Sequence, residues 1–416
     1  MNPTAKKYLI YSLGFLLLSV YVFLESQNRG DLTIYLNASR DLFKGDDIFV
    51  NTYFDGYHYF YSVLFAIIIY PLSFLPPWAY NSLWITLNIF LVYRIFLIIK
   101  NLLPLHDFSK KHLMFLRVCG FLFALRFIHE NIHAMQITII IMYLALQGLQ
   151  FIFANKYISG GALIALGINI KLLPIVLVPY LLYRGFFKGA IFTIVFYFLY
   201  MFIPAVVIGW DHNQQLLATW GHLINPLNSN HVLDTEERSF HGLSTLLSTL
   251  LVKNVPDKHA LTIPRNIADI SIEHLNLILN IVRLILIAFT LYFLRSAPFK
   301  KPVTFYQRFR EVSYILMLIP LIFPHQQHYA FLFVCPAFVF CIHYLIRNRN
   351  ELNKNFKKAI GFMLVLIYLI CNLKLLLGEF NEYYEHFKIL TYAAILLVIV
   401  LAFCEPKEKE SVNATV

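Results

Sequence analysis

Long uncharged apolar runs set the strongest limit on how this chain folds. The first extends from Tyr8 to Leu24, and another fills most of residues 57–100. Runs of about 17–25 residues match the thickness of a bilayer, and they lack the polar stripe of helices in soluble proteins. Only 14% of the residues are charged, against about a quarter in average soluble proteins. The sequence therefore predicts an all-α, polytopic membrane protein.

The positive charges indicate how the chain is oriented. A net charge of +11 is compatible with nucleic-acid binding. However, Lys and Arg cluster in short loops between apolar runs, as in "KNLLPLHDFSKKH" at 100–112. Such loops usually stay in the cytoplasm. We therefore expect the lipid bilayer as a partner, and no nucleic acid.

The run at 57–100 contains prolines and has two possible divisions. Two full spans joined at the prolines would place Lys100, Lys110 and Lys111 outside the cell, against the positive-inside rule. A short interfacial helix at 61–75, followed by one span from Trp78 to about Ile99, places these lysines in the cytoplasm. We favour this second division.

The same charge rule orders the rest of the chain. It predicts spans near 113–128, 136–153, 189–208, 272–294, 311–323, 328–346, 358–377 and 387–404, and two short helices at 160–183, split by Lys171 and Pro174. With the first span and the span from Trp78 this gives about 12 membrane helices in one domain, residues 1–404, followed by a short cytoplasmic tail, 405–416. The predicted extracytoplasmic loops are 31–75, with interfacial helices, "RFIHENIHAMQ" at 126–136, and 210–270.

Asp31 follows Gly30 at the start of a helix-compatible run and fits two interpretations. Aspartate is a preferred N-cap residue, and this structural role is the common one. The functional interpretation is a general base at the membrane boundary, where a carboxylate can accept a proton from a hydroxyl group. Tyr35, one helical turn later, would share the face of Asp31.

Lys171 interrupts an apolar run, which is an expensive place for a charge within a bilayer. Its predicted position at a helix break near the outer surface lets the side chain reach toward water. A cation at this place suits a phosphate group. A lysine that only extends to the interface is the structural alternative.

Several histidines and one arginine on the predicted outer face are further candidates. His129 and His133 have the spacing of a zinc pair, but no HExxH motif or carboxylate at a defined spacing accompanies them. We therefore expect these histidines, with His325 and His328, to line a cavity or to bind sugar or phosphate. Arg238 in the long loop fits either a surface ion pair or a bidentate phosphate contact.

The order of these features resembles glycosyltransferase family 87, in the GT-C superfamily of polyprenol-phosphate-sugar-dependent enzymes. The likeness is carried by Asp31-Leu-x-x-Tyr35, by "GGALIALGINIKLLPIVLVPYLLYRGFFKGA" and by "IFPHQQHYAFLFVCPAF", and it covers residues 8–345. Two family motifs match only in part. "AMQIT" keeps Gln136 of a Gly-Gln-x-Asn motif, and "ERSF" keeps Ser239 of an Asn-Gln-Ser stretch.

The resemblance implies a GT-C type fold and an inverting, mannosyltransferase-like enzyme of a bacterial plasma membrane. The donor would be a polyprenyl-phosphate sugar and the acceptor a glycolipid or glycan, both on the extracytoplasmic face. Asp31 would be the catalytic base, and no metal or other cofactor would be needed. The residues expected to bind the donor phosphate or sugar are Lys171, Arg238, His328, Tyr35, Gln136 and His325.

A lipid-linked-sugar transporter or flippase and an O-antigen-type polymerase are the alternatives. Broken helices such as 160–183 are typical of transporter sites at the membrane midplane, and a polymerase would also carry a large outer loop. The candidate charges, however, gather on one predicted face, and the sequence shows no inverted repeat. These two observations favour the transferase.

Overall fold

The computed structural model of the protein describes residues 3–225, 232–233, 240–302 and 304–405. Helices form all the regular elements of these residues, apart from one isolated bridge between Thr52 and His58. The α-helices are α1 (Pro3–Glu25), α2 (Asp31–Leu42), α3 (Val63–Ile69), α4 (Pro77–Leu102), α5 (Lys110–His133), α6 (Thr138–Phe153), α7 (Tyr157–Ile170), α8 (Leu177–Tyr183), α9 (Phe187–Phe202), α10 (Ala205–Ile208), α11 (Trp210–Leu223), α12 (Leu243–Leu251), α13 (Ile272–Leu294), α14 (Phe305–Ile322), α15 (Cys335–Arg347), α16 (Lys354–Asn372), α17 (Asn381–His386) and α18 (Ile389–Phe403). The 3-10 helices are Phe54–Gly56, Tyr70–Phe74, Leu173–Val176, His328–Val334, Leu373–Leu375 and Gly378–Phe380.

Seven helices of the described residues are long and apolar enough to cross a bilayer. They are α1, α4, α5, α9 with α10, α13, His328–Val334 with α15, and α16; α17 and α18 form a pair bent by 66° that would add an eighth. The predicted helical membrane protein is thus confirmed. The count of 12 is not confirmed, because α6, α7 and α8 are too short to be counted as spans, and α14 is not among the helices that pass by length and composition.

Some segments expected to be loops are helical. We expected a loop from Arg126 onward, but α5 continues to His133. Arg126 donates to Glu130 one turn later at 2.9 Å, so the charges that suggested a loop are paired along the helix. The predicted outer loop 210–270 likewise contains α11 and α12. The interfacial segment predicted at 61–75 forms α3 and the 3-10 helix Tyr70–Phe74.

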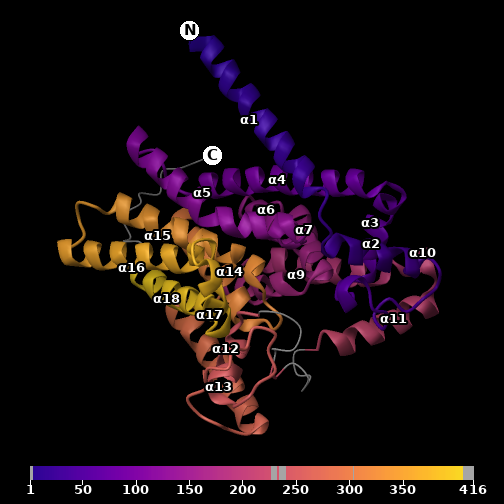
Figure 1. The fold of residues 1–416 in the computed structure, drawn as a ribbon. Helices are drawn as coiled ribbons and strands as arrows, with labels where there is room; N and C mark the ends of the chain where they lie inside the picture. Colours follow the sequence, from indigo (N-terminus) through magenta and orange to yellow (C-terminus); the bar gives the residue numbers. More distant parts are fainter. Residues whose placement is uncertain (1–2, 226–231, 234–239, 303, 406–416) are drawn as a thin grey trace.

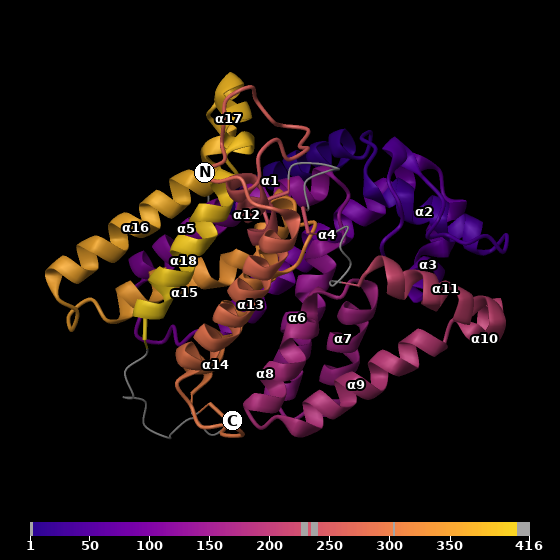
Figure 2. The same cartoon turned by 90° about the horizontal axis from the view of Figure 1, so that it is seen from below.

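Glycines bring α7 close to two neighbouring helices. A Cβ atom on Gly160 of α7 would lie 2.6 Å from the carbonyl oxygen of Gly148 in α6. On the other side, a Cβ atom on Gly161 would lie 2.8 Å from the backbone nitrogen of Thr193 in α9. Small residues allow such close helix packing in membranes. Figure 2 shows α6, α7 and α9 side by side, and this close packing holds the first turns of α7 between its two neighbours.

The helices α1 and α14 pack differently. Figure 1 shows α1 projecting away from the body, and its residues are exposed, as expected for a helix surrounded by lipid. In contrast, α14 is buried along most of its length, against α15, α18 and the 3-10 helix His328–Val334. α2 and α3 pack together where α1 ends. The candidate site lies between these N-terminal elements and the central bundle.

Candidate active site

One cavity collects several of the predicted site residues. It has a volume of about 180 Å³ and lies where α2 begins, α7 ends and α14 passes into the next 3-10 helix. Its polar lining includes Asp31, Tyr35, His58, Lys171, His325 and Gln326; its aromatic lining includes Tyr57, Phe60, Tyr61, Trp220, Phe240, Phe323 and Tyr329. The fold therefore brings Asp31, Tyr35, Lys171 and His325 together from distant parts of the sequence.

Asp31 is held by the link between α5 and α6. Its backbone N–H donates to the carbonyl oxygen of Ala134 at 3.0 Å. A Cβ atom on Gly30 would lie 2.6 Å from the same oxygen, so a side chain at that position would prevent this approach. Gly30 is the N-cap of α2, and Asp31 is the first residue of the helix. The N-cap interpretation of Asp31 is therefore wrong.

The carboxylate of Asp31 instead contacts a buried polar chain. The side-chain amide of Gln136 donates to Asp31 Oδ2. The hydroxyl of Tyr35 lies 3.4 Å from Gln136 Oε1 and donates to the hydroxyl of Tyr61 at 2.9 Å. Burial raises the pKa of both tyrosines well above the usual range, so both phenols stay neutral. Gln136, which is 2% exposed, thus fixes the orientation of the carboxylate.

Lys171 lines the same cavity. It follows the last residue of α7 and is outside the seven span-length helices. Its ammonium group lies 5.6 Å from the ring centre of Tyr61 and 6.0 Å from that of Tyr329. Burial lowers the pKa of Lys171 to about 8, although the charge of Asp31 acts in the opposite direction. Aromatic faces thus hold a cation whose charge a bound anion would stabilise further.

A hydrogen bond places Lys171 and Tyr61 at one cavity wall. The Ser62 hydroxyl donates to the side-chain oxygen of Asn169 at 2.8 Å, which joins the start of α3 to the last turn of α7. Ser62 is also the N-cap of α3, where its hydroxyl oxygen accepts from the backbone of Phe65. Tyr61, next to Ser62, and Lys171, two residues after Asn169, are therefore held in fixed positions.

The other predicted residues have different surroundings. His325 has a positive φ of 57° and lines the cavity between the rings of Phe60 and Phe240. His328 does not line it; its ring instead contacts Glu385 at 2.8 Å. Arg238 lies outside the described residues. The structure thus brings His325, but not His328, to the cavity with Asp31.

Glu385 is the centre of a second, buried cluster. This carboxylate is 1% exposed and contacts Lys374 at 3.0 Å and His241 at 3.0 Å, in addition to His328. Burial lowers the pKa of His241 to about 4. His241 joins the cluster to the cavity wall. It follows Phe240, which lines the cavity, and the backbone N–H of His241 donates to the carbonyl oxygen of Gln326, another lining residue. The cluster fixes the position of the wall without facing the cavity.

Some residues next to the predicted site residues were not predicted from the sequence. Tyr61 belongs to the aromatic run "YHYFY" at 57–61, which is the one signal that could have indicated a wall of the site. Tyr329 follows His328 in "IFPHQQHYAFLFVCPAF", a segment that carries the family resemblance. Nothing in the linear sequence distinguishes Glu385 from the exposed Glu382 on the same short helix.

Comparison with known proteins gives one match. A model of glycosyltransferase family 87 matches residues 59–309, more than half of the chain. The matched range contains Tyr61, Gln136 and Lys171, whereas Asp31 and His325 lie outside it. No curated protein and no solved structure matches the chain, so the GT-C fold type stays a prediction.

Proposed function

Because the chain belongs to glycosyltransferase family 87, we propose that it transfers a hexose, such as mannose, from a polyprenyl-phosphate donor to a glycolipid or glycan acceptor. The family and the apolar helices make the protein a membrane glycosyltransferase. We place the reaction on the extracytoplasmic face of a bacterial plasma membrane. This orientation is supported by the basic loops, whose charges favour the cytoplasm.

The observation that carries the proposal is one carboxylate and one ammonium group on the wall of the same cavity. Asp31 supplies the carboxylate and Lys171 the ammonium. A polyprenyl-phosphate sugar is a phosphodiester anion, and its phosphate gains negative charge as the sugar leaves. A fixed cation near that charge lowers the barrier. In this proposal the reaction itself uses no metal ion, because Lys171 stabilises the leaving group.

The proposed step exchanges one bond to the anomeric carbon for another. The acceptor oxygen bonds to that carbon while the bond from the carbon to the phosphate oxygen breaks. Asp31 accepts the acceptor's hydroxyl proton, and the polyprenyl phosphate leaves with the bonding electron pair. The acceptor attacks from the face opposite the phosphate, so the anomeric configuration inverts. Gln136 keeps the carboxylate directed at the acceptor.

The substitution Asp31→Asn tests this role. Asparagine keeps an oxygen for Gln136 and a similar shape, but it cannot accept the proton. We expect sugar transfer to fall by about 10²–10⁴-fold, with an unchanged thermal unfolding midpoint. Transfer is measured with purified protein in nanodiscs, radiolabelled polyprenyl-phosphate mannose, and a glycolipid extract from a deletion strain. The matched control is Asp41→Asn, on the same helix, whose carboxylate pairs with Lys44 and is not among the residues that line the cavity.

Other outcomes would contradict the proposal. A wild-type transfer rate in Asp31→Asn would exclude the base assignment. Movement of the donor across proteoliposomes without a new glycosidic bond would favour a flippase, for which the helix break at Lys171 would be the binding site. Addition of whole oligosaccharide units would favour a polymerase. Mass spectrometry of glycolipids from the deletion strain shows directly whether a product lacks one sugar.

A further inference from the structure

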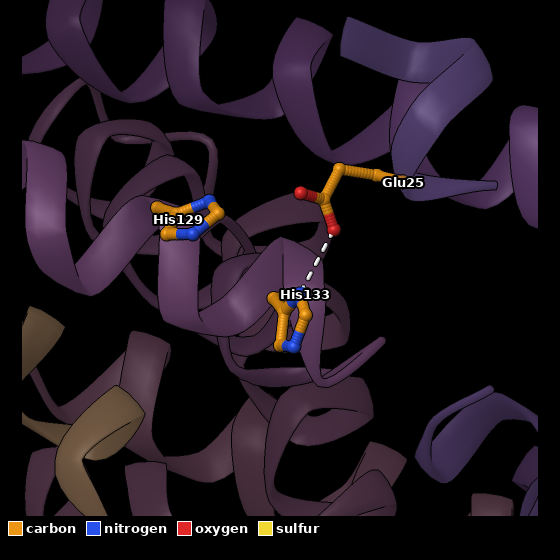
Figure 3. A group of neighbouring side chains, drawn as sticks. All are labelled: Glu25, His129 and His133. Atoms are coloured by element: carbon orange, nitrogen blue, oxygen red, sulfur yellow. Dashed lines mark hydrogen bonds and ion pairs between the residues drawn. The ribbon is translucent and has the colours of Figure 1, made fainter. Parts of the chain in front are cut away.

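A third group of titratable side chains lies outside the cavity, where α1 ends beside α5. Among the described residues, two groups of His and Glu have ligand atoms that all lie within 4.8 Å of one another. One is Glu25, His129 and His133, and the other is His241, His328 and Glu385. Figure 3 shows the first group, with the three side chains directed toward one another. We propose that Glu25, His129 and His133 bind a zinc-type metal ion.

The ligand set and its spacing suit zinc. His129 and His133 are four residues apart on α5, which puts both rings on one helix face. Glu25, the last residue of α1, supplies the carboxylate that the sequence alone did not pair with them. Ligands at about 2.0–2.2 Å around a tetrahedral ion lie roughly 3.3 Å apart. His133 Nδ1 and Glu25 Oε2 are already 3.0 Å apart.

The surroundings favour a cation that comes from solution. The side chain of His133 is 60% exposed, so an ion can reach the site. The nearest polar partners are neutral: the Tyr21 hydroxyl lies 3.0 Å from His129 Nδ1, and the Asn28 amide lies 3.3 Å from His133 Nδ1. Two imidazoles and one carboxylate leave a fourth position for water, as in other three-ligand zinc sites.

The buried group has the same residue types but is a poor metal site. The Lys374 ammonium lies 3.0 Å from Glu385 Oε1, where a metal ion would have to bind. Glu385 also contacts both histidines, at 3.0 Å and 2.8 Å. A second cation would repel that ammonium group and displace these contacts. The contrast assigns the metal to the exposed group.

A metal ion at this place would join α1 to the body of the protein. α1 is exposed along most of its length. Its last residue, Glu25, is five positions before Gly30 and six before Asp31. The backbone of Asp31 donates to Ala134, immediately after His133. Bound zinc would therefore restrain both segments that position Asp31, without touching the reacting groups. The site would thus act as a structural clamp outside the cavity.

Zinc binding to the whole protein tests the site. Tag-free protein in nanodiscs is treated with a chelator, dialysed and titrated with Zn²⁺ by calorimetry, and its metal content is measured by mass spectrometry. We expect one bound zinc per chain. His129→Gln and His133→Gln should each weaken zinc binding by about 100-fold or more. The control His222→Gln, on the exposed face of α11, should bind as wild type. Mg²⁺ should bind far more weakly, since it prefers oxygen ligands.

Amide hydrogen exchange distinguishes a zinc ion that restrains the chain from one that binds without restraining it. Zinc should slow amide exchange of residues 22–31 in wild-type protein and leave it unchanged in His133→Gln. The proposal is overturned if wild-type protein binds no zinc, or if the double variant His129→Gln/His133→Gln still binds it. Zinc binding without any change in exchange would overturn the clamp. None of these readouts depends on sugar transfer, so they also stand if the proposed enzymatic function fails.

Discussion

Asp31 and Glu385 are two carboxylates in contrasting surroundings. Asp31 is partly exposed, lines a cavity and accepts a hydrogen bond from Gln136. Glu385 is 1% exposed and is enclosed by two histidines and Lys374, all within 3.0 Å. A buried charge must be paired to be tolerated. A carboxylate that faces open space on one side can instead exchange a proton with a substrate. The difference favours a role in proton transfer for Asp31 and a structural role for Glu385.

Removing the charge of Glu385 should give the largest effect on stability. Glu385→Ala leaves Lys374, His241 and His328 without their shared partner. Breaking a buried ion pair costs about 3–5 kcal/mol, so we expect a clearly lower thermal unfolding midpoint in detergent. Transfer per folded molecule should stay near the wild-type value. Glu382→Ala, exposed on the same helix, is the control. A stable Glu385→Ala protein with no transfer would reverse the two roles.

Lys171→Met should show the opposite pattern, a large loss of activity with little loss of stability. The substitution removes a cation from the cavity but keeps a flexible side chain beside Tyr61 and Tyr329. Loss of one preorganised charge stabiliser costs about 10²–10³-fold in kcat. Lys44→Met, at an exposed ion pair, is the control. An unchanged kcat for Lys171→Met would show that another group stabilises the leaving phosphate.

The pH dependence of sugar transfer should reflect the lowered pKa of Lys171. The pKa of Lys171 is lowered to about 8, so its positive charge is lost as pH rises through that value. Because kcat/KM for the donor reports groups of the free enzyme, it should fall about tenfold per pH unit above pH 8. Lys171→Arg stays charged throughout this range, and its alkaline limb should be flat. A fall of equal size in Lys171→Arg would assign it to a different group.

The parts of this fold that could be predicted from sequence depend on local signals. Apolar runs located most helices, and the break at Lys171 followed from a charge and a proline within such a run. The face shared by Asp31 and Tyr35 follows from helical spacing. The end of α5 was missed because Arg126 and Glu130 suggest a loop when read as exposed charges, yet they pair along the helix.

The remaining features depend on which segments meet in space. Gln136 contacts Asp31 only because Gly30 allows the backbone to approach the α5–α6 link. Glu25 reaches His133 only because α1 ends beside α5. One sequence without aligned relatives contains no direct signal of these long-range contacts. Gly30 is visible before Asp31 in the sequence, but a glycine there fits an ordinary helix start equally well.

Tyr35→Phe should have the smallest effect and tests how Asp31 is positioned. The ring still packs on Tyr61 and Phe65, but the hydroxyl beside Gln136 is lost. A hydrogen bond of this kind contributes about 0.5–1.5 kcal/mol, so kcat/KM should fall by about tenfold or less. Tyr59→Phe is the control, because its buried hydroxyl bonds the backbone of Ser62 instead of the Asp31 chain. We expect similar stability losses in both variants and a reduced kcat only in Tyr35→Phe. Equal kcat values would mean that Gln136 orients the carboxylate without help from Tyr35.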